Sequence, residues 1–226
     1  MGGVETGAAA LGDLPLDQLR VALAPAIAEA AVFDGWSGAA LDMAADQHGL
    51  DRDVVHYAFK GGQQVMIGAW IKAIDHAMEE ALPAAALAGT PIRERIRRLV
   101  QFRLDQAEGK EEALSRALSI MAQPQNAGFA LRRGWASADR MWRLAGDNAT
   151  DYNHYTKRAI LASIYAATLT VYATDTSAGK AESRAFLDRR IKGVMRFEKA
   201  KARLLNSERE HFSVTRFLGR LRYPAR

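Results

Sequence analysis

The sequence predicts an all-α protein, and three observations support this prediction. Alanine and leucine, two of the best helix formers, account for 43 and 22 of the 226 residues. Only 6 prolines interrupt the chain, and no segment alternates apolar and polar residues as a half-buried strand does. The apolar residues recur instead at the three- and four-residue spacing of helices, and they predict nine helices before a final amphipathic segment.

The expected helices are, in chain order, 15–34, 37–48, 52–59, 63–81, 92–107, 111–121, 127–145, 151–174 and 181–205. Pro15 occupies an early position of the first helix, where proline is favoured. Ser37 and Asp51 are suitable N-caps for the second and third helices. Gly49 is placed to stop the second helix.

Proline and glycine separate the later helices as well. Pro83 follows the fourth helix, Pro91 starts the fifth, and Pro124 divides the sixth from the seventh. The turn at Gly146 precedes the eighth and most apolar helix. We expect four regions: a flexible start at 1–13, a helix-turn-helix-like module at 14–61, a helical ligand-binding domain at 62–205 and an amphipathic membrane-binding helix at 206–226.

The charge is distributed unevenly along the chain. The formal net charge is +5, which by itself hints at nucleic acid or an anionic membrane. Residues 180–226 contain 14 Lys or Arg and 5 Asp or Glu, a net of +9, so the preceding residues carry −4. The basic partner surface is therefore expected at the C-terminal end.

The first three expected helices resemble the helix-turn-helix domain of TetR-type regulators. Val54, Val55 and Phe59 are expected to anchor the third helix. Residues 36–60, however, carry four aspartates against Arg52 and Lys60, a net of −2 where a DNA-reading surface needs cations. We expect no nucleic-acid partner and interpret the module as a structural one.

The residue types exclude several classes of chemistry. The absence of cysteine rules out disulfides, a thiolate nucleophile and thiolate metal sites, and no phosphate loop, dinucleotide fingerprint or serine elbow occurs. The pairs Asp151/His154 and Glu208/His211 have the i, i+3 spacing of di-iron ligands. The two further inward-facing glutamates that such a site requires are missing, so we expect no enzyme activity, no metal and no cofactor.

Membrane contact is expected to be peripheral. The longest uncharged stretch, residues 159–174, has 16 residues, whereas a span needs about 20 apolar ones. Residues 1–12 resemble neither a secretory signal nor a transit peptide. After Ser207, a basic amphipathic helix with a Phe/Leu face is typical of membrane-surface binding; its residues are Val214, Arg216, Phe217, Leu218, Arg220 and Leu221.

A second feature is an excess of apolar residues on the fourth to eighth helices. As single residues they fit a closed core, but as a set they fit a lipid cavity between helices. The residues of this candidate pocket are Trp70, Phe102, Met121, Phe129, Trp135, Leu161, Ile164 and Thr168. Ala162, Ala166 and Ala167 leave room for a flexible chain.

Residues 147–172, read as DNATDYNHYTKRAILASIYAATLTVY, are preceded by Met141-Trp142 and followed by Asp175-Thr176-Ser177. Together with 116–120 and 123–126, this block resembles the accessory lipid-binding family of ubiquinone (coenzyme Q) biosynthesis. The resemblance covers about 35–205. It implies a TetR-like fold, a pocket for an isoprenoid or quinone lipid, membrane association and a non-enzymatic role.

The resemblance also implies a partner, the di-iron demethoxyubiquinone hydroxylase, to which family members present the quinone intermediate. The partner-binding positions carried over are Met141, Trp142, Asp151, His154, Tyr155 and Arg158. The chain departs from the family at His154-Tyr155, where a tryptophan–tyrosine pair is common. A bacterial protein at the cytoplasmic face of the inner membrane and a homodimer are further expectations. The alternative is a TetR-type transcriptional regulator that senses a lipophilic ligand.

Overall fold

The fold is given by a computed structural model, which describes residues 11–147 and 152–194. Within these ranges the chain forms helices and short turns but no strand, which confirms the all-α prediction. The elements are α2 (Leu16–Asp34), α3 (Gly38–His48), α4 (Arg52–Ala58), α5 (Gln63–Ala81), α6 (Ala84–Leu87), α7 (Ile92–Asp105), α8 (Glu111–Met121), η1 (Pro124–Asn126), α9 (Ala127–Leu144), α10 (Tyr152–Thr174) and η2 (Ala178–Lys180). Residues 181–194 are also helical.

The expected helix boundaries agree closely with these elements. α5 and α8 begin and end at the predicted residues, and α7 ends two residues early, at Asp105. The sequence did not predict α6, η1 and η2, because each has only a single turn, which is too short to show a helical apolar period. The part of the ninth helix beyond 194 and the amphipathic segment from Ser207 lie outside the described residues.

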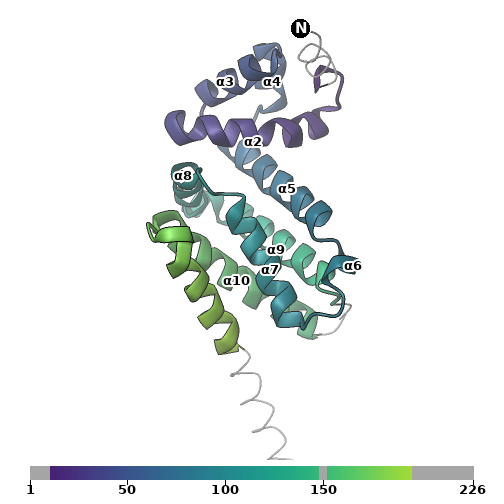
Figure 1. Cartoon of the computed structure of the whole chain (residues 1–226). Helices are drawn as coiled ribbons and strands as arrows, with labels where there is room; N and C mark the ends of the chain where they lie inside the picture. The colour runs from purple at the N-terminus through teal and green to yellow at the C-terminus, as the bar shows by residue number, and fades with distance from the viewer. Residues whose placement is uncertain (1–10, 148–151, 195–226) are drawn as a thin grey trace, which may run out of the picture. The chain divides into compact units, whose positions relative to one another are not determined.

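α2, α3 and α4 form the expected helix-turn-helix module (Figure 1). Gly49 ends α3 with φ 64°, a left-handed conformation that glycine adopts without steric cost. The Asp51 carboxylate caps α4 by accepting a hydrogen bond from the Asp53 amide at 2.8 Å. Val55 and Phe59 are buried as expected, but Val54 is 42% exposed, so that part of the prediction is wrong. Val54 follows Asp53 on the outer side of a helix only two turns long.

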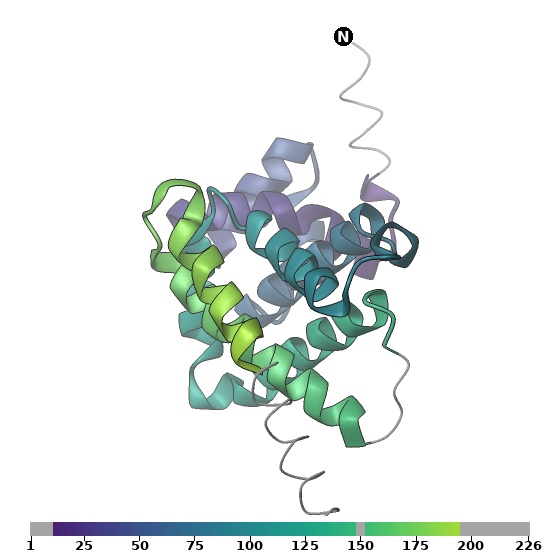
Figure 2. The same cartoon turned by 60° about the horizontal axis from the view of Figure 1, so that its bottom comes forward.

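The module packs directly against the following helices. α2 contacts both α3 and α5, and α5 continues from the module into the group formed by α7, α8, α9 and α10 (Figures 1 and 2). The indole N–H of Trp36 donates to the Ala113 carbonyl at 2.9 Å, which links the turn before α3 to α8. The chain up to Leu187 therefore forms one compact unit, and a second unit begins at Asp188.

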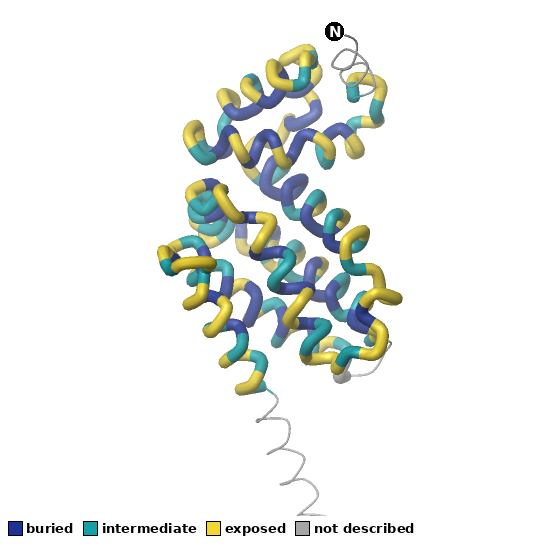
Figure 3. Tube along the Cα trace, viewed as in Figure 1, coloured by how far each residue is buried: buried dark blue, intermediate teal, exposed yellow. Residues whose placement is uncertain are grey.

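The core follows the sides of the helices that face one another, shown in dark blue in Figure 3. On α2, Leu19, Leu23 and Ile27 are almost completely buried at helical spacing. In the described residues, no helix combines the length and hydrophobicity that a membrane span requires.

Candidate functional site

A cavity of about 630 Å³ lies between α5, α7, α8, α9 and α10. Its wall is mostly apolar and includes Trp70 from α5, Met121 from α8 and Trp135 from α9. α10 contributes small residues, among them Ala162 and Ala166. A volume of this size and an apolar wall are typical of small-molecule sites, and they leave room for an extended apolar ligand.

Three of the eight residues predicted for the pocket, Trp70, Met121 and Trp135, line this cavity. The other five do not; they are Phe102, Phe129, Leu161, Ile164 and Thr168. Phe129 lines a separate pocket of about 340 Å³ beside α2 and α5. Leu161, Ile164 and Thr168 share the buried stripe of α10, whereas the cavity is lined by neighbouring stripes of that helix. The helical spacing of apolar residues shows which side of a helix is buried, but it does not show which of the buried residues border a cavity.

Sequence reasoning missed the polar part of the wall. Arg103, Ser137 and Tyr165 all line the cavity and are all buried. A signal for Arg103 was present, because this arginine continues the apolar stripe of α7 through Ile96 and Leu99. A charged residue in phase with an apolar stripe marks a buried ionic group rather than a solvated one.

Arg103 is the centre of a buried polar cluster. Its side chain is 1% exposed and forms an ion pair with Asp75 of α5. One terminal nitrogen donates to the Ser137 hydroxyl at 3.0 Å, and the guanidinium lies 5.0 Å from the centre of the Tyr165 ring. Burial opposes the charge, but Tyr165 and Asp75 outweigh it and raise the pKa of Arg103 above its usual value. The arginine therefore stays charged inside an apolar wall.

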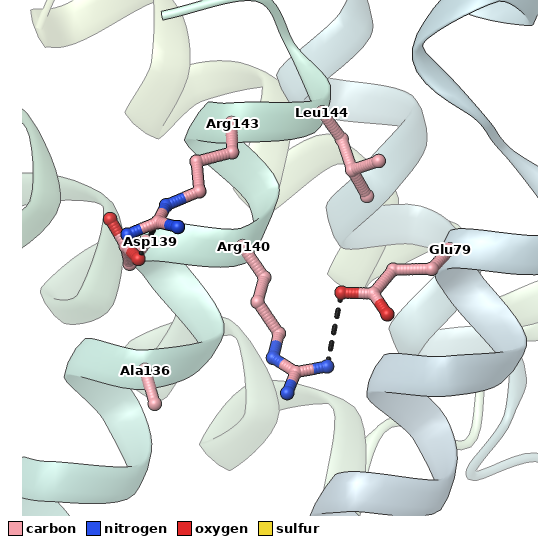
Figure 4. Close-up of a pocket in the computed structure, with 6 residues that line it drawn as sticks. All are labelled: Glu79, Ala136, Asp139, Arg140, Arg143 and Leu144. Carbon is pink, nitrogen blue, oxygen red and sulfur yellow. Dashed lines mark hydrogen bonds and ion pairs between the residues drawn. The ribbon is translucent and has the colours of Figure 1, made fainter. Parts of the chain in front are cut away.

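A second pocket, of about 490 Å³ and with mainly charged lining residues, lies between α5 and α9 (Figure 4). Here Arg140 of α9 extends toward Glu79 of α5, and the two form an ion pair at 3.0 Å. The Arg140 guanidinium also lies 3.7 Å from the Asp75 carboxylate. Asp75 thus joins two arginines, one facing the apolar cavity and one facing the second pocket.

The cavity is connected to an exposed aromatic group at the start of α10. Tyr155 is 61% exposed, and its ring centre lies 6.0 Å from that of Trp135 in the cavity wall. The ring of His154 meets Tyr155 edge-on at 5.1 Å. One aromatic pair therefore runs from the cavity wall to the protein surface.

Two of the residues predicted to bind the partner, Met141 and Arg158, are buried and cannot contact a partner directly. Met141 is completely buried, because it lies on the inner side of α9. Arg158 is 1% exposed and pairs with Asp139 at 2.6 Å and Asp147 at 3.2 Å. These ion pairs tie α10 to α9 and to the turn after α9.

Trp142, another predicted partner residue, lies at this joint. The Trp142 indole N–H donates to the Lys157 carbonyl at 3.0 Å, and the Lys157 ammonium lies 5.5 Å from the Trp142 ring centre. Burial raises the pKa of Asp147, but hydrogen bonds from Lys157 and Arg158 outweigh it and lower that pKa overall. Asp151 lies outside the described residues.

Two basic side chains of α4, Arg52 and His56, are paired with aspartates of α3. Arg52 forms a two-pronged ion pair with Asp46, at 2.9 and 2.5 Å, and His56 contacts Asp42 at 2.8 Å. The basic side chains at the start and in the middle of α4 are thus already matched by aspartates of α3.

Residues 11–147 and 152–194 contain no group of three or more His, Asp or Glu side chains arranged to hold a metal ion. Both Asp151 and the Glu208/His211 pair lie outside these ranges.

The chain is similar to a known protein family and to individual curated proteins. The COQ9 family model matches residues 127–198, which include α9, α10 and the start of the next helix. The chain is similar to the mitochondrial ubiquinone biosynthesis protein COQ9 of Rattus norvegicus, with 30% identity over 79% of this chain and 59% of the relative. The Homo sapiens protein of the same name is 29% identical over 79% of this chain and 58% of the relative. The chain thus spans about three fifths of the length of these curated relatives.

Among solved structures, the chain resembles a TetR transcriptional regulator from Nitrosomonas europaea. The TM-score is 0.62 with 19% identity, over 77% of this chain and 97% of the regulator. This likeness confirms the TetR-like fold.

Proposed function

Because the chain carries a COQ9 family domain on a TetR-like fold, we propose that it is a non-enzymatic accessory protein of ubiquinone biosynthesis. It binds an isoprenoid or quinone lipid in the 630 Å³ cavity and presents the lipid to the demethoxyubiquinone hydroxylase. The supporting observation is the position of Trp135, which both lines the cavity and stacks near the exposed Tyr155. A partner seated on Tyr155 would therefore contact the wall of the lipid site.

Two further parts of the proposal concern location and assembly. The basic amphipathic segment around Phe217 and Leu221 holds the protein on the surface of the inner membrane of a bacterium. The chain forms a homodimer, as TetR-like proteins commonly do through their last two long helices.

The lipid role is tested by mass spectrometry of lipid extracted from the purified protein. We expect a prenylated quinone or quinone precursor. Ala166→Phe places a ring at an exposed position of the cavity wall and should reduce the bound lipid at least fivefold. Thr174→Phe, at an exposed position of α10 outside the wall, is the matched control. Lipid content that is the same in all three proteins would contradict binding in this cavity.

A transcriptional regulator is the second candidate, because α3 and α4 have the helix-turn-helix arrangement. Its DNA-facing helix would start with Asp51 and Asp53, and its arginine is paired with Asp46. These carboxylates oppose phosphate binding, so we favour the lipid-binding accessory role.

A further inference from the structure

The small pocket of about 340 Å³ between α2, α5 and α9 has a cationic wall. Each of the three helices contributes one basic side chain, and these are Arg20 of α2, Lys72 of α5 and Arg133 of α9. Asp17 is the only carboxylate among the described residues that line the pocket. Three positive charges and one negative charge give the wall a formal net charge of +2.

These three cations are not neutralised by other parts of the folded unit. Among the residues that the structure describes, Arg20, Lys72 and Arg133 form no ion pair with an aspartate or glutamate. The Arg20 Nε–H donates to the Ala58 carbonyl, which is a neutral acceptor. A concave site lined by an excess of one charge concentrates the electrostatic field and attracts ions of the opposite sign.

Arg133 is held in a defined position although it has no carboxylate partner. Its guanidinium carbon lies 5.4 Å from the ring centre of Phe129, which is a cation–π contact within α9. The guanidinium also lies against Gly68 of α5, where an added Cβ would be 3.0 Å from a terminal nitrogen of Arg133. Glycine is unfavourable inside a helix, and at this position its missing side chain leaves the space that the guanidinium occupies.

The size and charge of the pocket favour a phosphate group as its ligand. The volume lies at the lower end of the range for small-molecule sites. A phosphate monoester carries nearly two negative charges at pH 7, which matches the net charge of the wall, and guanidinium groups bind phosphate through paired hydrogen bonds. A single carboxylate supplies only one negative charge and matches the wall less well.

We propose that the pocket between α2, α5 and α9 binds the phosphate group of a small, water-soluble molecule. Arg20 and Arg133, which are half-buried, hold the phosphate oxygens, and the exposed Lys72 adds its charge at the edge. Of the residues that line this pocket, Arg133 is the only one that also borders the 630 Å³ cavity. The phosphate site is therefore an addition to the proposed lipid-binding function.

Isothermal titration calorimetry of the full chain with inorganic phosphate and with pyrophosphate tests the site. We expect both ions to bind, with pyrophosphate the tighter of the two because it carries more negative charge. Acetate, which carries one charge, should bind at least tenfold more weakly than phosphate. The absence of binding by phosphate and pyrophosphate, or equal binding of acetate and phosphate, would overturn the proposal.

Two variants each remove one cation of the wall. We expect Lys72→Gln to weaken pyrophosphate binding at least threefold and Arg133→Gln at least tenfold, since hydrogen bonds to charged groups are among the stronger ones. Arg132→Gln is the matched control, because Arg132 is an exposed residue of α9 outside the pocket. An equal loss in all three variants would attribute binding to net charge alone and overturn the site. Lys72 is exposed, so Lys72→Gln decides the matter even where Arg133→Gln does not fold.

Gly68→Ala changes the geometry of the pocket and leaves every charge in place. Its Cβ displaces the Arg133 guanidinium, so we expect pyrophosphate binding at least threefold weaker. Gly128→Ala on α9 is the control, since a Cβ there meets Arg132 at an ordinary contact distance of 3.6 Å and lies outside the pocket. Unchanged binding in Gly68→Ala would contradict the role of Arg133.

Vesicles of phosphatidylglycerol distinguish a soluble phosphate from a lipid head group. We expect Lys72→Gln and Arg132→Gln to bind these vesicles equally well, and excess pyrophosphate to leave the Lys72→Gln to Arg132→Gln ratio unchanged. If Lys72→Gln alone lost vesicle binding while pyrophosphate did not bind the unchanged protein, the pocket would hold a lipid head group. The proposal of a soluble ligand would then be wrong.

Discussion

At the scale of single residues, Asp175 shows how a carboxylate becomes structural. It follows α10 and accepts four hydrogen bonds, from the amides and hydroxyls of Ser177 and Ser183, at 2.5 to 2.8 Å. Burial raises the pKa of Asp175, but these donors outweigh it and hold the pKa far below its usual range. Asp175 thereby connects the end of α10 to the start of helix 181–194.

We predict that Asp175→Asn destabilises the protein by about 1–3 kcal/mol at pH 7, because an amide offers one acceptor oxygen instead of two. Since the folded-state pKa is lowered, the stabilisation is present above the unfolded value of about 3.9 and is lost as the pH falls through the folded-state pKa. Urea unfolding of both proteins at pH 7 and pH 3 measures the difference in their unfolding free energies, which should be smaller at pH 3. If the difference in unfolding free energy between the two proteins were equal or larger at pH 3, the proposed role of the Asp175 carboxylate would be contradicted.

Tyr155, unlike the buried Asp175, lies mainly at the protein surface. Its side chain is 61% exposed, and its ring lies near the rings of Trp135 and His154. We predict that Tyr155→Ala changes the free energy of unfolding by less than about 0.5 kcal/mol and weakens binding of the hydroxylase at least tenfold, as an aromatic hot spot does. Calorimetric titration with the purified hydroxylase measures the loss. Tyr57→Ala, at a similarly exposed tyrosine of α4, is the control and should bind normally.

At the scale of elements, the joint between α9 and α10 decides where Tyr155 is held. Arg158 crosses this joint and joins Asp139 on α9 to Asp147 in the turn that follows. It also donates to the His154 carbonyl at 3.1 Å. Arg158 therefore acts on the proposed partner surface through its effect on the position of α10.

We predict that Arg158→Met destabilises the protein by about 1–3 kcal/mol, because Asp139 and Asp147 each lose one cation and keep only Arg143 and Lys157, respectively. Arg158→Lys should recover part of this loss, since an ammonium can still pair with one of them. Chemical unfolding measures the loss of unfolding free energy in both variants. If Arg158→Met were as stable as the unchanged protein and lost only partner binding, Arg158 would be a direct contact residue after all.

The element α4 allows a test of the regulator alternative. Its arginine is paired with Asp46, and Asp51 and Asp53 lie at its start. We predict no binding of random duplex DNA in a gel shift at about 100 mM salt, because binding depends on neutralising phosphates. Steep salt-sensitive binding that is abolished by Arg52→Ala would revive the regulator.

At the scale of the whole molecule, the charge is distributed unevenly along the chain, and most of the basic end lies outside the residues that the structure describes. The net charge of +9 belongs to residues 180–226, of which only 180–194 are described. The described helices cannot cross a membrane. The proposed membrane contact is assigned to the basic amphipathic segment, which contains Arg216, Arg220 and Arg222.

We predict that the full chain binds anionic vesicles at least tenfold more tightly than a chain ending at Leu205. Each basic residue near an anionic surface adds about 1 kcal/mol, and the removed segment supplies Arg216, Arg220 and Arg222. Vesicle co-sedimentation at equal protein concentration measures the ratio, with uncharged vesicles as the control. Equal binding by the two chains would refute the membrane role of this segment.

Most of the fold was predictable because its signals are local. Gly49, Asp51 and the prolines between helices act through their own backbone conformation or a neighbouring amide, so their effects can be read within a few residues. The candidate site was less predictable. Phe102 and Leu161 have the same apolar spacing as Trp70 and Trp135, and only the packing of five helices decides which of them border a void.

The sequence by itself determined the all-α class, nearly all helix boundaries, the acidic module and the basic end, because composition, caps and helical period are local quantities. Only the tertiary structure decided that Arg158 is buried, that Trp135 meets Tyr155, and that Arg103 is buried in an ion pair with Asp75. Each of these facts depends on side chains from different helices meeting at distances of a few ångströms. The physical reason is that burial and pairing belong to the packing between elements, which no single stretch of the sequence contains.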